Sequence, residues 1–407
     1  MTRFLRYTFL FSCYLFFTLS VAAQPASKNG FSSTRMDLLG SFIDSEIEDQ
    51  KLHGGVCLIQ RKGKEVYRNT YGYSDLARKK RMQEDHIFYI QSMTKPIISI
   101  AFMMLYEEGH FLLSDPIEKY LPQFKDMKVA KDPGAGLESA MENANGSITI
   151  AQLLSHQAGL SHGLGSSKLD KTYFKELYLT QHADIEARVN VLAQMPLVGQ
   201  PGEQWYYSAS PDVLALLIEK FSGMTTADFL QKRLFDPLGM KDTGYNLPKN
   251  KQARVVAVHG FDKEGKIVKN ERQVPMEGNT IFGGTHGLFS TAADYMVFCQ
   301  MLLNKGEWQG KRYISRKTLE LMTTDHTKGK HPDDGIGFGL GFGVRINQTA
   351  ELLPGSIGQF YWSGAFNTYF FIDPQEEMIA ILMMQLTPYT DYYKKKFRQF
   401  VYQSIVD

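Results

Sequence analysis

The segment YIQSMTKP, residues 89–96, decides the fold of this chain. Apolar side chains follow it at helical spacing through residues 97–105, and the pattern stops near Gly109. Side chains three residues apart on a helix share one face, so Lys95 can lie against the Ser92 hydroxyl. The segment therefore predicts a buried helix whose first turn carries a serine and a lysine side by side.

Such a pair is suited to nucleophilic chemistry. A free hydroxyl is a poor nucleophile and needs a base to take its proton, and a lysine is that base only if burial or a nearby cation lowers its pKa. Ser92 at a helix start would also lie near unpaired backbone N–H groups that can stabilise an oxyanion. The alternative is a serine N-cap followed by a solvated lysine. The apolar helix favours the first interpretation, and no other S-x-x-K occurs in the sequence.

A second serine motif competes with this one. Residues 159–163 read GLSHG, a literal G-x-S-x-G. A nucleophile elbow needs a strand before the serine and a helix after it. Here residues 149–156 have a helical pattern and a polar loop follows, so we predict a helix-ending turn, with Ser161 kept as the alternative nucleophile. We expect His156, at that helix end, to be structural.

An aromatic cluster lies further along the chain, in residues 203–210, EQWYYSAS. A tyrosine beside a lysine ammonium can have its pKa lowered and can then exchange protons with a serine or a leaving group. Tyr207 is the candidate for that role. The alternative is that Tyr206 and Tyr207 are simply packed aromatics.

The order of the predicted elements indicates an α+β fold of mixed architecture. We expect helices at 36–50 and 389–406, strands at 55–60, 65–71, 359–362, 368–373 and 378–384, and mostly helices and loops in 112–280. A helix and hairpin at one end, with strands and a helix at the other, suggest one antiparallel sheet built from both termini. The predicted sheet domain covers about 33–111 and 281–407, and 112–280 is the helical insertion.

The N-terminus has the features of a secretory signal peptide. Arg3 and Arg6 precede an apolar run at 7–19, and small residues end at Ala23. Residues 1–23 are the predicted signal and 24–407 an exported hydrolase, periplasmic or secreted; an uncleaved membrane anchor is the alternative. Loss of the two arginines takes the formal charge from +2 to 0, so neither nucleic acid nor anionic membrane is an expected partner.

Cysteine and histidine spacing indicates no metal site and no cofactor. Beyond the predicted signal, the chain has Cys57 in a strand-like run and Cys299 among apolar helix positions. Export would permit a disulfide between them, but two separately buried thiols are the expectation.

Three motifs in sequence order resemble those of the serine beta-lactamase-like superfamily. This superfamily contains class C beta-lactamases, D-alanyl-D-alanine carboxypeptidases and family VIII carboxylesterases. Residues 92–95 match its Ser-x-x-Lys motif, 207–209 occupy the place of Tyr-x-Asn, and 362–364 resemble Lys-Thr-Gly. Residues 153–160 and 283–291 are also similar to family segments, and the likeness covers about 36–405.

The resemblance implies a fold and a mechanism. The fold would be a beta-lactamase/transpeptidase-like antiparallel sheet flanked by helices, with an inserted helical domain. Ser92 would be acylated, with Lys95 and Tyr207 as the general-base pair, and Tyr207 or a water it activates would serve deacylation. The backbone N–H groups of Ser92 and Ala365 would form the oxyanion hole.

Two departures from the family pattern bear on substrate. Trp362 stands where penicillin-recognising members carry a cation, and it cannot form a charge-assisted hydrogen bond with a carboxylate. Ala209 replaces an asparagine that could hold a substrate amide. The candidate substrate-contacting residues are Ala209, His286, Trp362, Ser363 and Gly364.

These departures resemble the family VIII esterase variant, so small or medium carboxylic esters are the first expected substrates. A penicillin-binding DD-peptidase or weak beta-lactamase acting on amides is the alternative. A non-catalytic binding or sensor protein is a third possibility. The expected partner is a small-molecule ester or amide, and the oligomeric state stays open.

Overall fold

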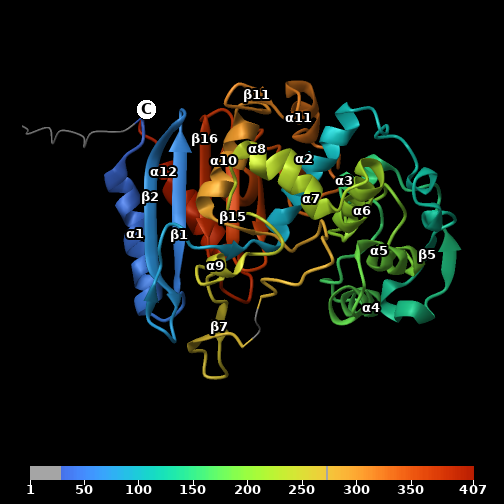
Figure 1. The fold of residues 1–407 in the computed structure, drawn as a ribbon, viewed down its shortest axis with the longest axis horizontal. Helices are drawn as coiled ribbons and strands as arrows, with labels where there is room; N and C mark the ends of the chain where they lie inside the picture. The colour runs from blue at the N-terminus through green and yellow to red at the C-terminus, as the bar shows by residue number, and fades with distance from the viewer. Residues whose placement is uncertain (1–28, 272–273) are drawn as a thin grey trace, which may run out of the picture.

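One eight-stranded antiparallel sheet, on the left in Figure 1, brings together the two ends of the chain. The computed structural model describes residues 29–271 and 274–407, so the predicted signal peptide lies outside the described residues. Strand β1 (Gly54–Arg61) pairs antiparallel with β16 (Met378–Met383). A sheet assembled from both ends of the chain, as the sequence predicted, is therefore confirmed.

The remaining strands of the sheet extend it on either side of this pair. The strand order is β12-β13-β14-β15-β16-β1-β2-β3. The bounds are β2 (Lys64–Asp75), β3 (Lys80–Arg81), β12 (Ile336–Phe338), β13 (Gly343–Arg345), β14 (Phe360–Gly364) and β15 (Thr368–Asp373). Each neighbouring pair is antiparallel. The mixed α+β class is thus confirmed.

Helices pack on both faces of the sheet. Three long helices pack on it, α1 (Ser33–Glu48), α10 (Ala292–Leu303) and α12 (Asp391–Gln403). Successive side chains of a strand point to opposite faces. Accordingly, Val56 and Leu58 of β1 join the hydrophobic cluster that contains α10, whereas Cys57 and Ile59 join the cluster that contains α1 and α12.

The same alternation explains the cysteines. Cys57 belongs to the cluster on the α1 face and Cys299, on α10, to the cluster on the other face. Both thiols are buried and free, and burial raises the pKa of each. The expectation of two separate buried thiols is confirmed.

The segment between the two parts of the sheet is mostly helix and loop. Its helices are α3 (Ile150–Leu154), α4 (Lys168–Phe174), α5 (Ile185–Gln194), α6 (Ser210–Ser222), α7 (Thr226–Leu230), α8 (Asp236–Leu238) and α9 (Lys249–Gln252). It also holds two small hairpins, β5 (Lys128–Ala130) with β6 (Met141–Asn143) and β7 (His259–Phe261) with β8 (Ile267–Lys269). Beyond it lies α11 (Arg316–Met322).

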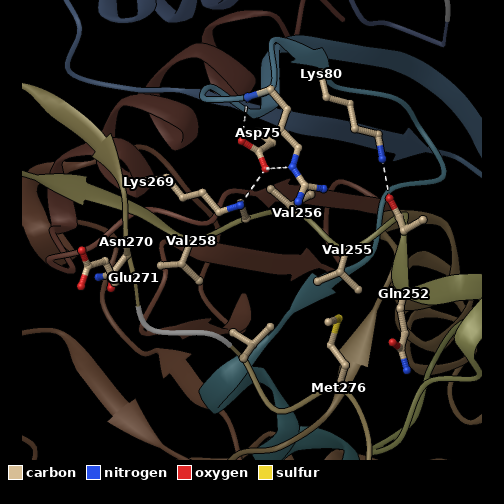
Figure 2. A pocket seen from close by; sticks show the side chains of 14 residues that line it. Asp75, Lys80, Gln252, Val255, Val256, Val258, Lys269, Asn270, Glu271 and Met276 are labelled. Atoms are coloured by element: carbon tan, nitrogen blue, oxygen red, sulfur yellow. Dashed lines mark hydrogen bonds and ion pairs between the residues drawn. The ribbon is translucent and has the colours of Figure 1, made fainter.

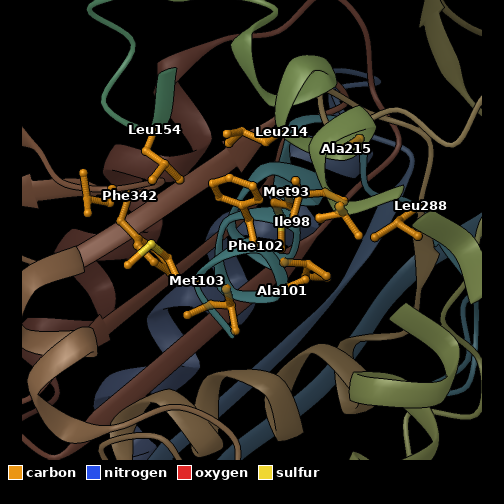
Figure 3. Close-up of a cluster of buried hydrophobic side chains, with 14 of the residues drawn as sticks. Met93, Ile98, Ala101, Phe102, Met103, Leu154, Leu214, Ala215, Leu288 and Phe342 are labelled. Atoms are coloured by element: carbon orange, nitrogen blue, oxygen red, sulfur yellow. The ribbon is translucent and has the colours of Figure 1, made fainter. Parts of the chain in front are cut away.

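One helix joins this segment to the sheet. Helix α2 (Thr94–Glu107) is buried from Thr94 to Leu105 and packs on α6. Figure 3 shows Phe102 of α2 and Leu214 of α6 in one cluster with Phe342, which lies beside the sheet. The hydrophobic core is therefore continuous between the two parts, and the division at residues 112 and 280 stays a prediction.

Helix α3 is shorter than the predicted 149–156. Thr149 caps its start in a reciprocal pair with Gln152. His156 has φ +56°, which takes the backbone out of the helix. In the described part of the chain, no helix has both the length and the apolar character needed to cross a bilayer.

Candidate active site

Ser92 lies in a single 3-10 turn, Gln91–Met93, which leads directly into α2. Ser92 therefore lies in the helical turn that opens this helix, and the regular α-helix begins two residues later, at Thr94. Gln91 has φ +48°, a conformation that is uncommon for residues other than glycine. The Met93 carbonyl accepts a hydrogen bond of 3.0 Å from the phenol of Tyr295, which holds the turn against α10.

The three predicted catalytic side chains come together at this turn. The Tyr207 phenol donates a hydrogen bond of 2.8 Å to Ser92 Oγ, and Lys95 Nζ lies 3.1 Å from the same oxygen. Tyr207 is separated from Ser92 by 115 residues, so tertiary structure makes this contact. The arrangement places a proton donor and an amine on one hydroxyl.

The Lys95 amine is enclosed by protein. The residue is 1% exposed, and its Nζ donates to the Thr285 carbonyl at 2.9 Å and lies 3.3 Å from His162 Nε2. Burial holds the pKa of Lys95 well below its usual 10.5; the Asp212 carboxylate opposes that shift and the Arg188 guanidinium adds to it. A neutral amine beside a hydroxyl is a competent general base.

Tyr207 differs from expectation. Burial raises its pKa, and the hydrogen bond with Ser92 only partly opposes this. The predicted lowering by a lysine ammonium is wrong for two reasons. Lys95 Nζ lies over the Tyr207 ring, 4.6 Å from its centre, rather than at the oxygen, and a neutral amine carries no charge. Tyr207 is therefore a neutral phenol, able to donate a proton.

Aromatic side chains fix the Tyr207 ring. His162 stacks on it with ring centres 4.8 Å apart, and His156 meets it edge-on at 5.2 Å. Trp362 lies 5.5 Å away on a third side. His156 is itself held by Ser208 Oγ, 2.8 Å from its Nδ1. This geometry agrees with a structural role for His156.

Several residues at the site were missed at the level of sequence. Thr285 contacts Lys95 through its carbonyl, and its N–H donates to Asp212 Oδ1 at 2.8 Å. Asp212 forms a buried ion pair of 2.9 Å with Arg188 Nε. His162 lies in the GLSHG segment, but no sequence pattern there indicates a contact with Lys95. Nothing in the sequence pattern pointed to the Asp212–Arg188 pair.

The GLSHG segment forms a turn. Ser161 is completely buried, and its hydroxyl donates to Asp170 Oδ1 at 2.5 Å and accepts the Gly163 N–H at 2.9 Å. Gly159 and Gly163 both have positive φ, which breaks the chain direction on either side of the serine. Neither a preceding strand nor a following helix adjoins Ser161, so the elbow geometry is missing.

The third motif lies on β14. A Cβ on Gly364 would come within 2.4 Å of the Ile90 carbonyl, so glycine lets this strand approach the segment before Ser92. Ser363 Oγ lies 3.2 Å from the Tyr389 hydroxyl, and Ala365 is exposed just beyond the strand end. Phe338, whose ring centre is 5.2 Å from that of Trp362, adds to an aromatic wall.

The other candidate contact residues lie at different depths. Ala209 has no exposed surface and belongs to the hydrophobic core, so the structure does not bring it to the surface of the site. His286 is half-buried, with its ring centre 5.4 Å from that of Tyr178.

A cavity of about 530 Å³ lies elsewhere (Figure 2). Valine side chains, among them Val255 and Val258, line it, and an ion pair of 2.8 Å between Lys269 and Asp75 lies on its wall. None of the predicted site residues contributes to it. The candidate active site is therefore the cluster around Ser92, and this cavity is separate from it.

Comparison with known proteins gives a consistent answer. A profile of the family described as Beta-lactamase matches residues 39–401. Protein Rv1367c of Mycobacterium tuberculosis is 31% identical over 352 residues, covering 83% of this chain and 86% of that protein. Esterase EstB of Burkholderia gladioli is 24% identical over 373 residues, covering 86% and 90%.

The D-alanyl-D-alanine-carboxypeptidase/endopeptidase AmpH of Escherichia coli K12 is 27% identical over 374 residues, covering 91% of this chain and 88% of that protein. Among solved structures, EstCE1, described as a hydrolase with promiscuous acyltransferase activity, superposes with a TM-score of 0.76. Its sequence is 22% identical, and the match covers 91% of this chain and 99% of that chain. This likeness confirms the predicted fold. The family match over residues 39–401 shows that the chain is a serine hydrolase of the beta-lactamase family.

Proposed function

We propose that this protein is a carboxylesterase that acts through an acyl-enzyme on Ser92. One observation carries the proposal: Ser92 Oγ lies within hydrogen-bond distance of both a buried amine, Lys95 Nζ at 3.1 Å, and a phenol, Tyr207 at 2.8 Å. A nucleophile touching a base and a proton donor is the arrangement that covalent acyl transfer requires. The same cluster counts against a purely binding or sensor role.

Each group has a distinct task in the proposed reaction. Lys95 takes the Ser92 proton as Oγ bonds to the acyl carbon, and the N–H groups of Ser92 and Ala365 hold the carbonyl oxygen as it becomes negative. Tyr207 gives its proton to the departing alkoxide. Water then enters in place of the alcohol, and the Tyr207 phenolate takes its proton as it attacks the acyl carbon. The Lys95 ammonium returns its proton to Ser92 Oγ as the acid leaves, which restores all three groups.

The walls of the site support esters as the substrate class. Trp362, which is half-buried, presents apolar surface next to Tyr207, and the third motif offers no cation for a substrate carboxylate. The likeness to Esterase EstB over most of both chains adds support. Export through residues 1–23 is part of the proposal and rests on sequence alone.

The test is a comparison of two chromogenic substrates with residues 24–407 and the Ser92→Ala variant. We expect p-nitrophenyl butyrate to be hydrolysed, a chromogenic cephalosporin to be a poor substrate, and the variant to lose both activities. A faster cephalosporin reaction would contradict the ester proposal. Full ester hydrolysis by Ser92→Ala would contradict the assigned nucleophile.

The likeness to AmpH favours one second candidate, a DD-peptidase. That function predicts a stable covalent adduct between Ser92 and penicillin, with slow release. Intact mass spectrometry after penicillin treatment separates the two. We expect no long-lived adduct from the esterase, whereas a persistent mass increase that Ser92→Ala abolishes would support the peptidase.

A further inference from the structure

The inference rests on the proposed function and concerns how the lone pair of the Lys95 amine is oriented toward Ser92. A neutral lysine amine has two N–H groups and one lone pair, and the ammonium has three N–H groups. Three neighbours lie within 3.3 Å of Lys95 Nζ: the Thr285 carbonyl, His162 Nε2 and Ser92 Oγ. The Thr285 carbonyl can only accept, so it takes one N–H. The second N–H and the lone pair are shared between the other two neighbours.

The tautomer of His162 decides which of these two neighbours takes the second N–H of Lys95 and which faces its lone pair. Its Nδ1 lies 2.5 Å from the Tyr178 hydroxyl, and its Nε2 faces Lys95. Burial lowers the pKa of His162 well below its usual value, so the ring is neutral. In the tautomer with the proton on Nδ1, the ring donates to Tyr178 and its Nε2 accepts from Lys95.

The backbone holds this ring in place. The His162 N–H donates to the Tyr207 carbonyl, and the Ala209 N–H donates to the Ser161 carbonyl, both at 3.2 Å. The imidazole is stacked on the Tyr207 ring. The side chain of Ala209, nearby on the opposite segment, is a methyl group that cannot accept a hydrogen bond. With the proton on Nδ1, His162 is the side chain whose nitrogen acceptor meets the Lys95 amine.

We propose that His162 is a positioning residue: its Nε2 accepts one N–H of Lys95 and so leaves the amine lone pair directed at the Ser92 hydroxyl. After proton transfer, the Lys95 ammonium donates to Thr285, to His162 and toward the Ser92 oxygen, so each of its hydrogens has an acceptor. No hydrogen bond joins His162 to Ser92 in the described part of the chain, so its Nε2 acts through Lys95, while its ring also stacks on Tyr207.

The experiment is a pH profile of kcat/KM for p-nitrophenyl butyrate hydrolysis by residues 24–407, comparing wild type, His162→Leu and His162→Gln. Leucine has no acceptor, whereas the glutamine amide oxygen offers one. We expect His162→Leu to lose about ten- to hundredfold in kcat/KM, the value of one hydrogen bond to a charged group. His162→Gln should recover most of that loss.

The position of the acid limb of the pH profile distinguishes a hydrogen bond from Lys95 to His162 from a role of His162 in packing alone. Hydrogen bonding to His162 favours the ammonium form, so its loss lowers the pKa of Lys95 further and moves the acid limb of the profile to lower pH, by about one unit. The other titratable and charged groups around Lys95 are His156, Tyr178, Arg188, Tyr207, Asp212 and His286. All are retained in both variants, so the shift reports on His162.

His182→Leu is the matched control, because His182 is half-buried and its ring is hydrogen-bonded to the Glu176 carbonyl, with no hydrogen bond to Lys95 among the described residues. We expect it to leave the profile unchanged. If His162→Leu does not fold, Tyr178→Phe is the second variant. Tyr178 is half-buried, and the change removes the hydroxyl that contacts His162 Nδ1, so we expect a smaller shift of the acid limb in the same direction.

An unmoved acid limb in a folded His162→Leu variant, or no recovery in His162→Gln, would overturn the inference. If Ser92→Ala retains hydrolysis in the same assay, the proposed function itself fails, so the two failures are distinguishable.

Discussion

Two serines of this chain, Ser92 and Ser161, both lie in motifs that occur in serine hydrolases, yet their surroundings differ. The Ser92 hydroxyl contacts the Lys95 amine and the Tyr207 phenol. The Ser161 hydroxyl is completely buried and donates to the Asp170 carboxylate. Each serine therefore has a titratable partner, and the partner's chemistry separates them.

The pKa of each partner is lowered, with opposite consequences. Burial lowers the pKa of Lys95, which leaves a neutral amine ready to accept a proton. For Asp170 burial raises the pKa, but hydrogen bonds from Ser161, Ser167 and Tyr206 outweigh it and the net shift is downward. A lowered carboxyl pKa makes a weaker base. A serine motif thus indicates catalysis where the neighbouring base can still accept a proton, as Lys95 can. It does not do so where hydrogen bonds hold the base in its ionised form, as they hold Asp170.

The largest expected effect comes from removing the base at Ser92. Lys95→Met keeps the length and burial of the side chain and deletes the amine. General-base catalysis is worth about 10²- to 10⁴-fold, so we expect a loss of that order in kcat/KM for p-nitrophenyl butyrate. Steady-state kinetics measure it, with circular dichroism as the check on folding. A variant that keeps wild-type rates would remove the distinction between the two serines.

The pH dependence of the wild type sharpens the comparison. Activity requires neutral Lys95, and the neutral fraction falls about tenfold per pH unit below its pKa. Because that pKa lies well below its usual 10.5, we expect kcat/KM to rise with pH and to level off well before pH 10.5. Initial rates corrected for spontaneous ester hydrolysis test this. A rise that continues to pH 10 would show that Lys95 is an ordinary ammonium.

The corresponding change at the second serine should affect stability instead. Asp170 is 1% exposed, and Asp170→Asn leaves its hydroxyl donors poorly satisfied, so we expect a loss of about 1–3 kcal/mol in the free energy of unfolding at pH 7. The folded-state pKa is below the unfolded value, so this stabilisation is present above about pH 4 and is lost as pH falls through the folded-state pKa.

Urea unfolding of wild type and Asp170→Asn at pH 7 and at about pH 3 measures that difference. If the difference in the free energy of unfolding between the two proteins is no smaller at about pH 3 than at pH 7, Asp170 is not stabilised as an ionised, hydrogen-bonded carboxylate.

The smallest expected effect belongs to Ser161→Ala. The change removes one buried hydrogen bond to Asp170, so we expect about 1 kcal/mol of destabilisation in urea unfolding. Ester hydrolysis should continue, because the hydroxyl has no contact with Ser92 or Lys95. Loss of hydrolysis by Ser161→Ala together with retention by Ser92→Ala would exchange the roles that we assign to the two serines.

Much of the fold and part of the site could be predicted because the signals are local. The strand-like run around Cys57 and the two C-terminal strands before Asp391 led to the antiparallel sheet. The spacing of Ser92 and Lys95 placed them on one helix face. The direction of the Tyr207 pKa shift could not be predicted, because it depends on burial and on where Lys95 lies relative to the Tyr207 ring.

The sequence by itself determined that a serine and a lysine would be neighbours in a buried turn, because three residues of helix fix that relation without help from the rest of the chain. Only the tertiary structure decided what else meets them. His162, Tyr207 and Thr285 reach the site across separations of 67, 115 and 190 residues. Contacts at such separations depend on how the sheet and the helices pack, and no local pattern of residues encodes that packing.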